Sequence, residues 1–191
     1  MTEKCAQYIV EWLITCGVIR RSEYNLYAFA AHSFLMTAAL LGLTILIGTI
    51  MGHIVVAIEI ISLFMPVRKF SGGYHAKKPW MCLICSSIIL CICIYCSSYI
   101  TYGYGLLFIT LMAMISLIIN SPIDSAGRVL DVSEQHLYKK ITAVLVGLSA
   151  IIILVCALNG KEDAARNFAI GIVMAGILQI PCLLQKIVQK N

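Results

Sequence analysis

Long apolar runs separated by short polar segments make up most of the chain. Neither residues 24–58 nor residues 79–123 contain any Asp, Glu, Lys or Arg. Because about 20 apolar residues cross a bilayer as a helix, the apolar stretch 24–67 is long enough for two passes, and 79–123 is long enough for two more. The runs 141–160 and 167–185 predict a fifth and a sixth pass.

Local signals predict where these helices end. Glycines at Gly48 and Gly52 favour a turn in the first long run, and the segment 102–105 (Tyr-Gly-Tyr-Gly) favours a turn in the second. Pro122 should stop the fourth pass, because the residue before a proline avoids helical backbone angles. The segment 131–134 (Asp-Val-Ser-Glu) is similar to a capping box, so a helix is expected to begin there and run into the fifth pass.

The first 23 residues differ from the rest. Apolar side chains within 4–16 recur at the spacing of one helix face, and polar ones lie away from it. This segment is too short and too polar to span a bilayer. We therefore expect residues 1–23 to form an interfacial helix, with Trp12 as an anchor.

The composition supports lipid as the main solvent. Of the 191 residues, 61% are hydrophobic and 12% are charged, and a soluble domain of this size cannot bury that much apolar surface. The expected fold is all-α: one polytopic membrane domain over residues 1–191, with about six transmembrane helices. Residues 67–81 are interpreted as a catalytic cytoplasmic loop, and residues 120–140 as a second cytoplasmic loop.

The positive charges test this arrangement independently. With both termini inside the cell, twelve Lys and Arg residues lie on the cytoplasmic side, and only Lys161 and Arg166 lie outside. Removing one pass would place basic loops on opposite sides. The net charge of +5 is therefore assigned to helix orientation and to lipid headgroups rather than to nucleic acid.

The first basic loop carries the candidate chemistry. If Pro79 begins the third pass, Cys82 lies in its first turn, where free backbone N–H groups and the helix dipole favour the nucleophilic thiolate. Lys77 and Lys78 add positive charge nearby. The pattern therefore indicates an activated cysteine at the cytoplasmic face.

A base for this cysteine precedes it by seven residues. On one continuous helix His75 would be about 10 Å from Cys82 along the axis, so the chain must fold back to join them. Gly72 and Gly73 give the backbone that freedom. In this interpretation His75 takes the thiol proton and later gives it to the leaving amine, and Arg68 binds a substrate carboxylate or positions the loop.

Each of these residues also has a simpler interpretation. A histidine in a basic membrane loop is usually interfacial, a cysteine at a helix start usually packs, and two glycines often only form a turn. Glu59, an acid within the second pass, could orient His75 or be a hydrogen-bonded structural acid. The remaining histidines are expected to be structural, interfacial or simply exposed: His32, His53 and His136.

Metal binding is the other chemistry considered. Cys82 and Cys85, like Cys93 and Cys96, have the spacing of zinc ligands. They fall on one apolar helix, however, and a closed tetrahedral site needs ligands that converge. We expect no metal and no cofactor, and no phosphate-binding or dinucleotide motif is present.

The run from Arg68 through Gly72, Gly73 and His75 to Cys82 resembles the signature of the accessory gene regulator B (AgrB) family, and the resemblance covers almost the whole chain. It implies a bacterial membrane cysteine endopeptidase with His75 and Cys82 as the catalytic pair. It also implies a small AgrD-like precursor peptide as substrate, cut to give a cyclic thiolactone or lactone signal for quorum sensing. A homodimer is compatible with this interpretation. The alternatives are a small membrane transporter or export channel for a peptide, and a structural module without chemistry.

Overall fold

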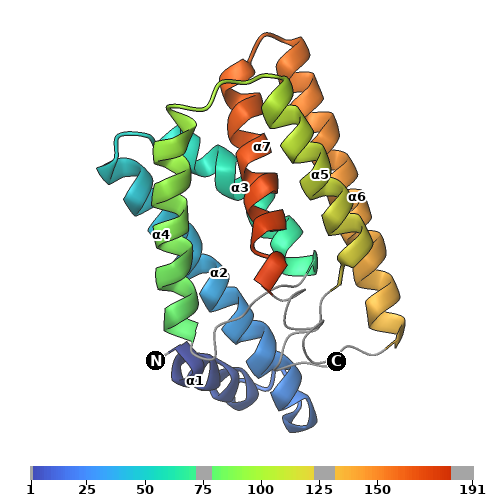
Figure 1. Ribbon diagram of the computed structural model, residues 1–191. Coiled ribbons are helices and arrows are strands. Elements are labelled where there is room, and N and C mark those ends of the chain that lie inside the picture. Colours follow the sequence, from blue (N-terminus) through green and yellow to red (C-terminus); the bar gives the residue numbers. More distant parts are fainter. Residues whose placement is uncertain (1, 72–78, 123–131, 182–191) are drawn as a thin grey trace.

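The computed structural model describes residues 2–71, 79–122 and 132–181, and these are helical without any strand. A short 3-10 turn, η1 (Arg21–Glu23), precedes the second helix. The helices of the described residues follow one another through the bundle in Figure 1: α1 (Thr2–Thr15), α2 (Tyr24–Ile50), α3 (Ile54–Ser71), α4 (Pro79–Ser97), α5 (Tyr104–Asn120), α6 (Val132–Leu158) and α7 (Glu162–Ile177).

The local signals at Gly52, Pro122 and residues 131–134 are confirmed. Helix α2 ends at Ile50, and α3 begins after a turn in which Gly52 has φ +70°, a left-handed angle that suits glycine. Helix α5 ends at Asn120, and Ser121 before the proline is extended, with φ −86° and ψ 150°. Helix α6 begins within the segment that is similar to a capping box.

Three helix boundaries differ from the sequence-based ones. Helix α3 continues to Ser71, so Arg68 lies in its last turn rather than in a loop, where a cation complements the negative end of the helix dipole. Helix α4 ends at Ser97 and α5 begins at Tyr104, so the turn between them begins before the predicted one at residues 102–105. Helix α7 begins at Glu162 instead of at residue 167, because an acid in the first turn is favoured by the same dipole. Charged residues were interpreted as loop, although helix ends accommodate them.

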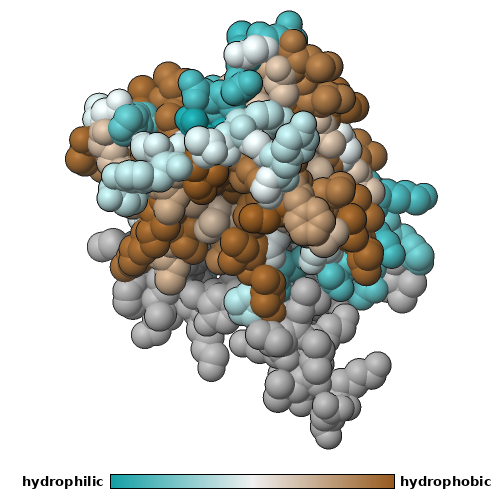
Figure 2. Space-filling model, turned by 45° about the horizontal axis from the view of Figure 1, so that its top comes forward, coloured by the Kyte–Doolittle hydropathy of each residue, from teal (hydrophilic) through white to brown (hydrophobic). Residues whose placement is uncertain are grey.

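The outer surface of the bundle is apolar. Two helical stretches, residues 21–50 and 134–158, are long and apolar enough to cross a membrane. Figure 2 shows brown, hydrophobic residues over much of the visible flank, with hydrophilic residues gathered towards the upper end. On α6 alone, large exposed side chains include Val144, Leu148 and Leu154, far more apolar surface than water tolerates. The protein is therefore a helical membrane protein, and six passes stays a prediction.

Helix α7 lies at the centre of the bundle. Its small residues Ala165, Ala169 and Ala175 belong to one core cluster with side chains from α3, α5 and α6. Gly171 lies so close to α3 that an added Cβ would be 2.5 Å from the Ile60 carbonyl oxygen. Small residues of this kind allow the backbones of membrane helices to approach closely.

The two ends of the bundle are different. The turns α2–α3, α4–α5 and α6–α7 lie at one end (Figure 1). The other end holds α1, the last turns of α3, α5 and α7, and the first turns of α4 and α6. Helix α1 buries Ala6 and Val10 in this end, while Tyr8 and Trp12 are 73% and 65% exposed. We call this second end the α1 end.

Candidate active site

The candidate catalytic segment joins α3 to α4 at the α1 end. The backbone of Cys82 lies in the first turn of α4, as its fourth residue, so the prediction that Pro79 begins this helix is confirmed. Five other predicted site residues fall outside the described part of the chain, and their roles are untested: Gly72, Gly73, His75, Lys77 and Lys78.

Arg68 brings a half-buried cation to this end of α3. Its guanidinium carbon lies 5.8 Å from the centroid of the Phe64 ring, a distance at which the face of the ring attracts the cation. Phe64 is itself 5% exposed. The planar charge is therefore fixed on an aromatic surface close to the end of α3, whereas the neighbouring Lys69 is exposed.

An aromatic contact joins this end of α3 to the start of α6. The rings of Phe70 and Tyr138 have centroids 5.7 Å apart and are tilted by 57°. Tyr138 lies in α6, within the residues 120–140 that were predicted as the second cytoplasmic loop. Helices α3 and α6, which adjoin the two predicted cytoplasmic loops, are thus in contact at this end.

Buried polar side chains also gather at the α1 end. Gln179, which is fully buried, donates from Nε2 to the hydroxyl of Ser121 at 3.2 Å. This bond joins the chain after α7 to the end of α5. Ser71 and Thr142 are buried in the last turn of α3 and in α6. These buried polar groups lie inside the bundle rather than against lipid.

Glu59 lies towards the other end of the bundle. It is in the second turn of α3, about 18 Å along the helix axis from Ser71. Its Oε2 accepts a 2.7 Å hydrogen bond from Nδ2 of Asn167 in α7. Of the two interpretations of Glu59, the hydrogen-bonded structural acid is the one with a described partner. The other interpretation involves His75, outside the described residues.

The two other side chains of this hydrogen-bonded group, Asn167 and Ser97, were not predicted from the sequence. Asn167 also accepts a 2.5 Å hydrogen bond at Oδ1 from the hydroxyl of Ser97, the last residue of α4. Ser97 and Asn167 are each 1% exposed. A lone amide in an apolar helix was a usable signal for Asn167, because such groups in lipid need partners, but nothing marked Ser97 out among the other serines.

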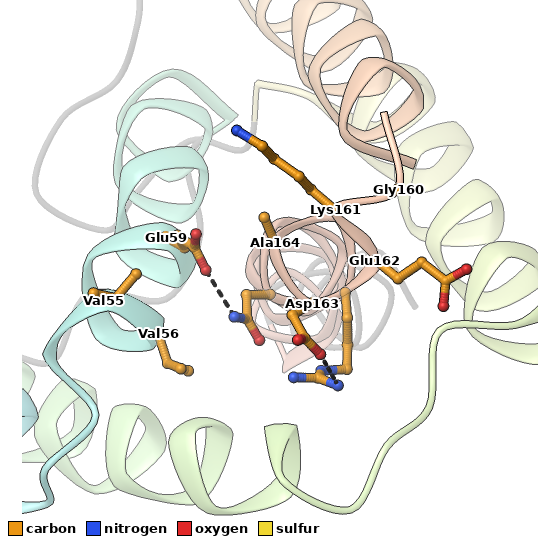
Figure 3. Close-up of a pocket in the computed structure, with 10 residues that line it drawn as sticks. Val55, Val56, Glu59, Gly160, Lys161, Glu162, Asp163 and Ala164 are labelled. Carbon is orange, nitrogen blue, oxygen red and sulfur yellow. Dashed lines mark hydrogen bonds and ion pairs between the residues drawn. The ribbon is translucent and has the colours of Figure 1, made fainter. Parts of the chain in front are cut away.

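A pocket of about 600 Å³ adjoins this group. Figure 3 shows Val55, Val56 and Glu59 of α3 on one side and the chain from Gly160 onward on the other, with the Glu59 bond and the Asp163–Arg166 ion pair as dashed lines. The ion pair is 2.8 Å long. This pocket lies at the end that carries the α6–α7 turn, opposite the candidate catalytic segment (Figure 1).

The other candidate ligands are dispersed. His53 lies exposed in the α2–α3 turn and His136 is exposed on α6, which confirms the expected exposure of His136. His32 is half-buried in α2. Within the described ranges no group of three or more His, Cys, Asp or Glu side chains could hold a metal ion. Cys85 is exposed whereas Cys93 is buried, although both lie on α4.

A bundle whose described elements are all helical, with an apolar outer surface, defines a helical membrane protein. Comparison with known proteins gives the family: the chain belongs to the Accessory gene regulator B (AgrB) family, whose model matches residues 2–183. It is similar to Protein FsrB of Enterococcus faecalis, with 27% identity over 172 residues. The match covers 86% of this chain and 66% of that protein, so the chain spans just under two thirds of its relative. No solved structure matches.

Proposed function

We propose that this protein is a membrane cysteine endopeptidase that processes a small precursor peptide for quorum sensing. Cys82 is the nucleophile and His75 is the general base. Membership of the AgrB family supports the role in peptide quorum sensing. The enzyme releases the C-terminal part of the precursor and promotes closure of the remaining part to a thiolactone or lactone.

One observation carries this proposal: the backbone of Cys82 lies in the first turn of α4. The first four N–H groups of a helix have no partner within the helix, and the dipole adds partial positive charge there. Both favour the thiolate, which is the reactive form of cysteine. The described cysteines further along the helix, such as Cys93, lack this position.

The chemistry follows from these two groups. His75 removes the proton from Cys82, and the thiolate attacks the scissile carbonyl to form a carbon–sulfur bond. The carbon–nitrogen bond breaks, and the His75 imidazolium gives its proton to the leaving amine. A thiol or hydroxyl within the bound peptide then attacks the thioester, loses its proton to His75, and returns Cys82 as a thiolate. No oxidant, reductant or nucleotide is needed.

The surroundings favour ring closure and an acidic substrate. Exclusion of water from the thioester slows hydrolysis relative to attack by the bound peptide. Arg68, held over the Phe64 ring, would bind a carboxylate of the substrate. Lys139 and Lys140, exposed in the first part of α6, add positive charge at the same end and steer an acidic tail towards it. Gly72, Gly73, Lys77 and Lys78 shape and charge the intervening segment.

The proposed location is the bacterial cell membrane, with six passes and both termini in the cytoplasm. The α1 end then faces the cytoplasm, where the precursor is made, and the pocket near Glu59 faces outward. The positive-inside bias of the sequence supports this orientation.

The test is co-expression with a short AgrD-like precursor peptide that has a central Cys or Ser and an acidic C-terminal part, followed by mass measurement of the products. The native protein should release the C-terminal part and leave a cyclic product that is lighter than the linear N-terminal fragment by one water. Cys82→Ala should leave the precursor intact. With His75→Ala, slow processing should remain, because Cys82 keeps its helix position. Equal processing by native protein and Cys82→Ala would refute the peptidase.

A transporter is the second candidate, supported by the pocket beside the half-buried Glu59. Substituting Cys82 by serine separates the two functions. A transporter would keep most of its flux with Cys82→Ser, whereas a thiol peptidase would lose processing, because a neutral hydroxyl is a far weaker nucleophile than a thiolate.

A further inference from the structure

Three buried or half-buried side chains form a hydrogen-bonded row across three helices. The hydroxyl of Ser97 in α4 donates to Asn167 Oδ1 at 2.5 Å, and Asn167 Nδ2 in α7 donates to Glu59 Oε2 in α3 at 2.7 Å. The Asn167 amide oxygen can only accept a hydrogen bond, and its nitrogen can only donate one. All the bonds of the row therefore run in one direction, from Ser97 to Glu59, and they fix the orientation of the Asn167 amide.

This row differs from most polar side chains of the described helices. Thr44, Thr110 and Ser149 are equally well buried, but each hydroxyl bonds to a carbonyl of its own helix, four residues earlier. Such bonds satisfy a polar group without joining helices. The Ser97–Asn167–Glu59 row joins α4 to α7 and α3, whereas α2 also packs against α4 without a described side-chain hydrogen bond to it.

Helices α3 and α7 form a fixed pair at this level. An added Cβ at Gly171 would lie 2.5 Å from the Ile60 carbonyl oxygen, so the two backbones are in direct contact one turn below Asn167. Helix α4 meets this pair through apolar side chains, Leu90, Cys93 and Ile94. Apolar contacts have no preferred direction, whereas the hydrogen bond of Ser97 fixes one point of α4.

That point is the far end of the helix that carries the proposed nucleophile. Ser97 is the last residue of α4 and Cys82 is in its first turn, so about 22 Å of helix separates them. A tilt of about 5° at the Ser97 end would therefore move the backbone of Cys82 by about 2 Å, given that rise per residue. A misplacement of about 1 Å can lower a catalysed rate on the order of 100-fold.

We propose that Ser97, Asn167 and Glu59 are positioning residues for Cys82: the row fixes α4 against α3 and α7, and so sets the position of the helix start that carries the nucleophile. This inference rests on the proposed peptidase function. It gives the half-buried acid of α3 a role at long range, through the helices rather than through contact with substrate.

The test uses Ser97→Ala with Ser149→Ala as its matched control. Both serines are 1% exposed, and both variants lose one hydroxyl, but only Ser97 bonds to another helix. Precursor processing is measured with the full-length protein in vesicles. Ser97→Ala should lower kcat about tenfold or more with KM changed less than about twofold, because positioning of the nucleophile affects the chemical step. Ser149→Ala should leave both within about twofold of the native values.

A second pair tests the other end of the row. Glu59→Gln keeps a carbonyl oxygen for the Asn167 amide, whereas Glu59→Met removes the acceptor and keeps the length. The glutamine variant should recover most of the kcat that the methionine variant loses. A glutamine variant as impaired as the methionine variant would show that the charge matters instead, and would overturn the inference.

Cys82→Ala is assayed alongside to separate the two proposals. If Cys82→Ala still processes the precursor, the peptidase function fails. If Cys82→Ala is inactive while Ser97→Ala matches Ser149→Ala, only the positioning role fails. A rise in KM equal to the fall in kcat would also overturn it, because that pattern indicates altered substrate binding rather than a displaced nucleophile.

Discussion

Phe70 near the end of α3 and Tyr138 near the start of α6 stack at a tilt, with ring centroids 5.7 Å apart. Phe70 lies just before the connection from α3 to α4, and Tyr138 lies in the second turn of α6. Aromatic pairs at this distance stabilise by about 0.5–1.5 kcal/mol beyond the area they bury. This contact therefore fixes the two helices at the α1 end, where the proposed active site lies.

A double-mutant cycle measures this contact. Phe70→Leu and Tyr138→Leu, alone and together, should give a coupling free energy of about 0.5–1.5 kcal/mol for unfolding in mixed micelles. The control cycle is on Tyr95 and Tyr99, whose rings are 5.0 Å apart but belong to exposed side chains at the end of one helix. Coupling at Phe70–Tyr138 no larger than that of the control would contradict the prediction.

The close approach of α7 to α3 predicts opposite effects of one substitution at two glycines. Gly171→Ala forces a methyl group against the Ile60 carbonyl oxygen, so it should lower the free energy of unfolding by about 1–3 kcal/mol. At Gly147, in the middle of α6, an added Cβ meets nothing within 4 Å. Gly147→Ala should therefore leave stability unchanged or raise it by up to about 1 kcal/mol. Thermal unfolding of both variants checks the pair, and a stable Gly171→Ala would show that the two helices can separate.

Arg68 and Lys69 are adjacent cations with different surroundings. Arg68 is half-buried over the Phe64 ring, and Lys69 is exposed. Arg68→Ala should lower kcat/KM for precursor processing by at least about tenfold, since a charge-assisted hydrogen bond to a substrate carboxylate contributes about 1.5–3 kcal/mol. Lys69→Ala should change it less than about twofold, because exposed charges are screened by salt. Equal losses in the two variants would mean that net charge, rather than the fixed guanidinium, attracts the substrate.

The membrane orientation predicts which turns are accessible from outside the cell. A protease site inserted after Gly160, in the α6–α7 turn, should be cut in intact cells, and the same site added after Asn191 should be cut only after lysis. The reason is that the twelve basic residues on the α1 side oppose translocation of that side. Cleavage of the second site in intact cells would rule out a cytoplasmic C-terminus.

Helix ends were predictable wherever a residue restricts or permits particular backbone angles at or next to its own position. Pro122 ends α5 and Gly52 turns the chain before α3 because each acts within one or two residues of itself. Arg68 and Glu162 were assigned to loops because charge was treated as a sign of loop structure. Their positions at helix ends follow from the helix dipole instead.

The candidate nucleophile was predictable, whereas the row of hydrogen bonds was not. Cys82 could be placed because Pro79 marks a helix start three residues before it. Asn167 and Glu59 are 108 residues apart, and Asn167 and Ser97 are 70 apart. Hydrophobic periodicity gives the apolar runs but not which helices become neighbours, so no pattern along the chain pairs these side chains.

Helix α7 is seated among α3, α5 and α6 through alanines and glycines, and it is also the last of these helices to be synthesised. The ribosome therefore releases α7 only after α3, α5 and α6 have been made, and its small residues can then pack against helices that are already present. Because lipid tails compete equally for apolar side chains, the gain comes from tight fit alone. A truncation before Glu162 would thus remove the central helix and leave the inner faces of α3, α5 and α6 without their packing partner.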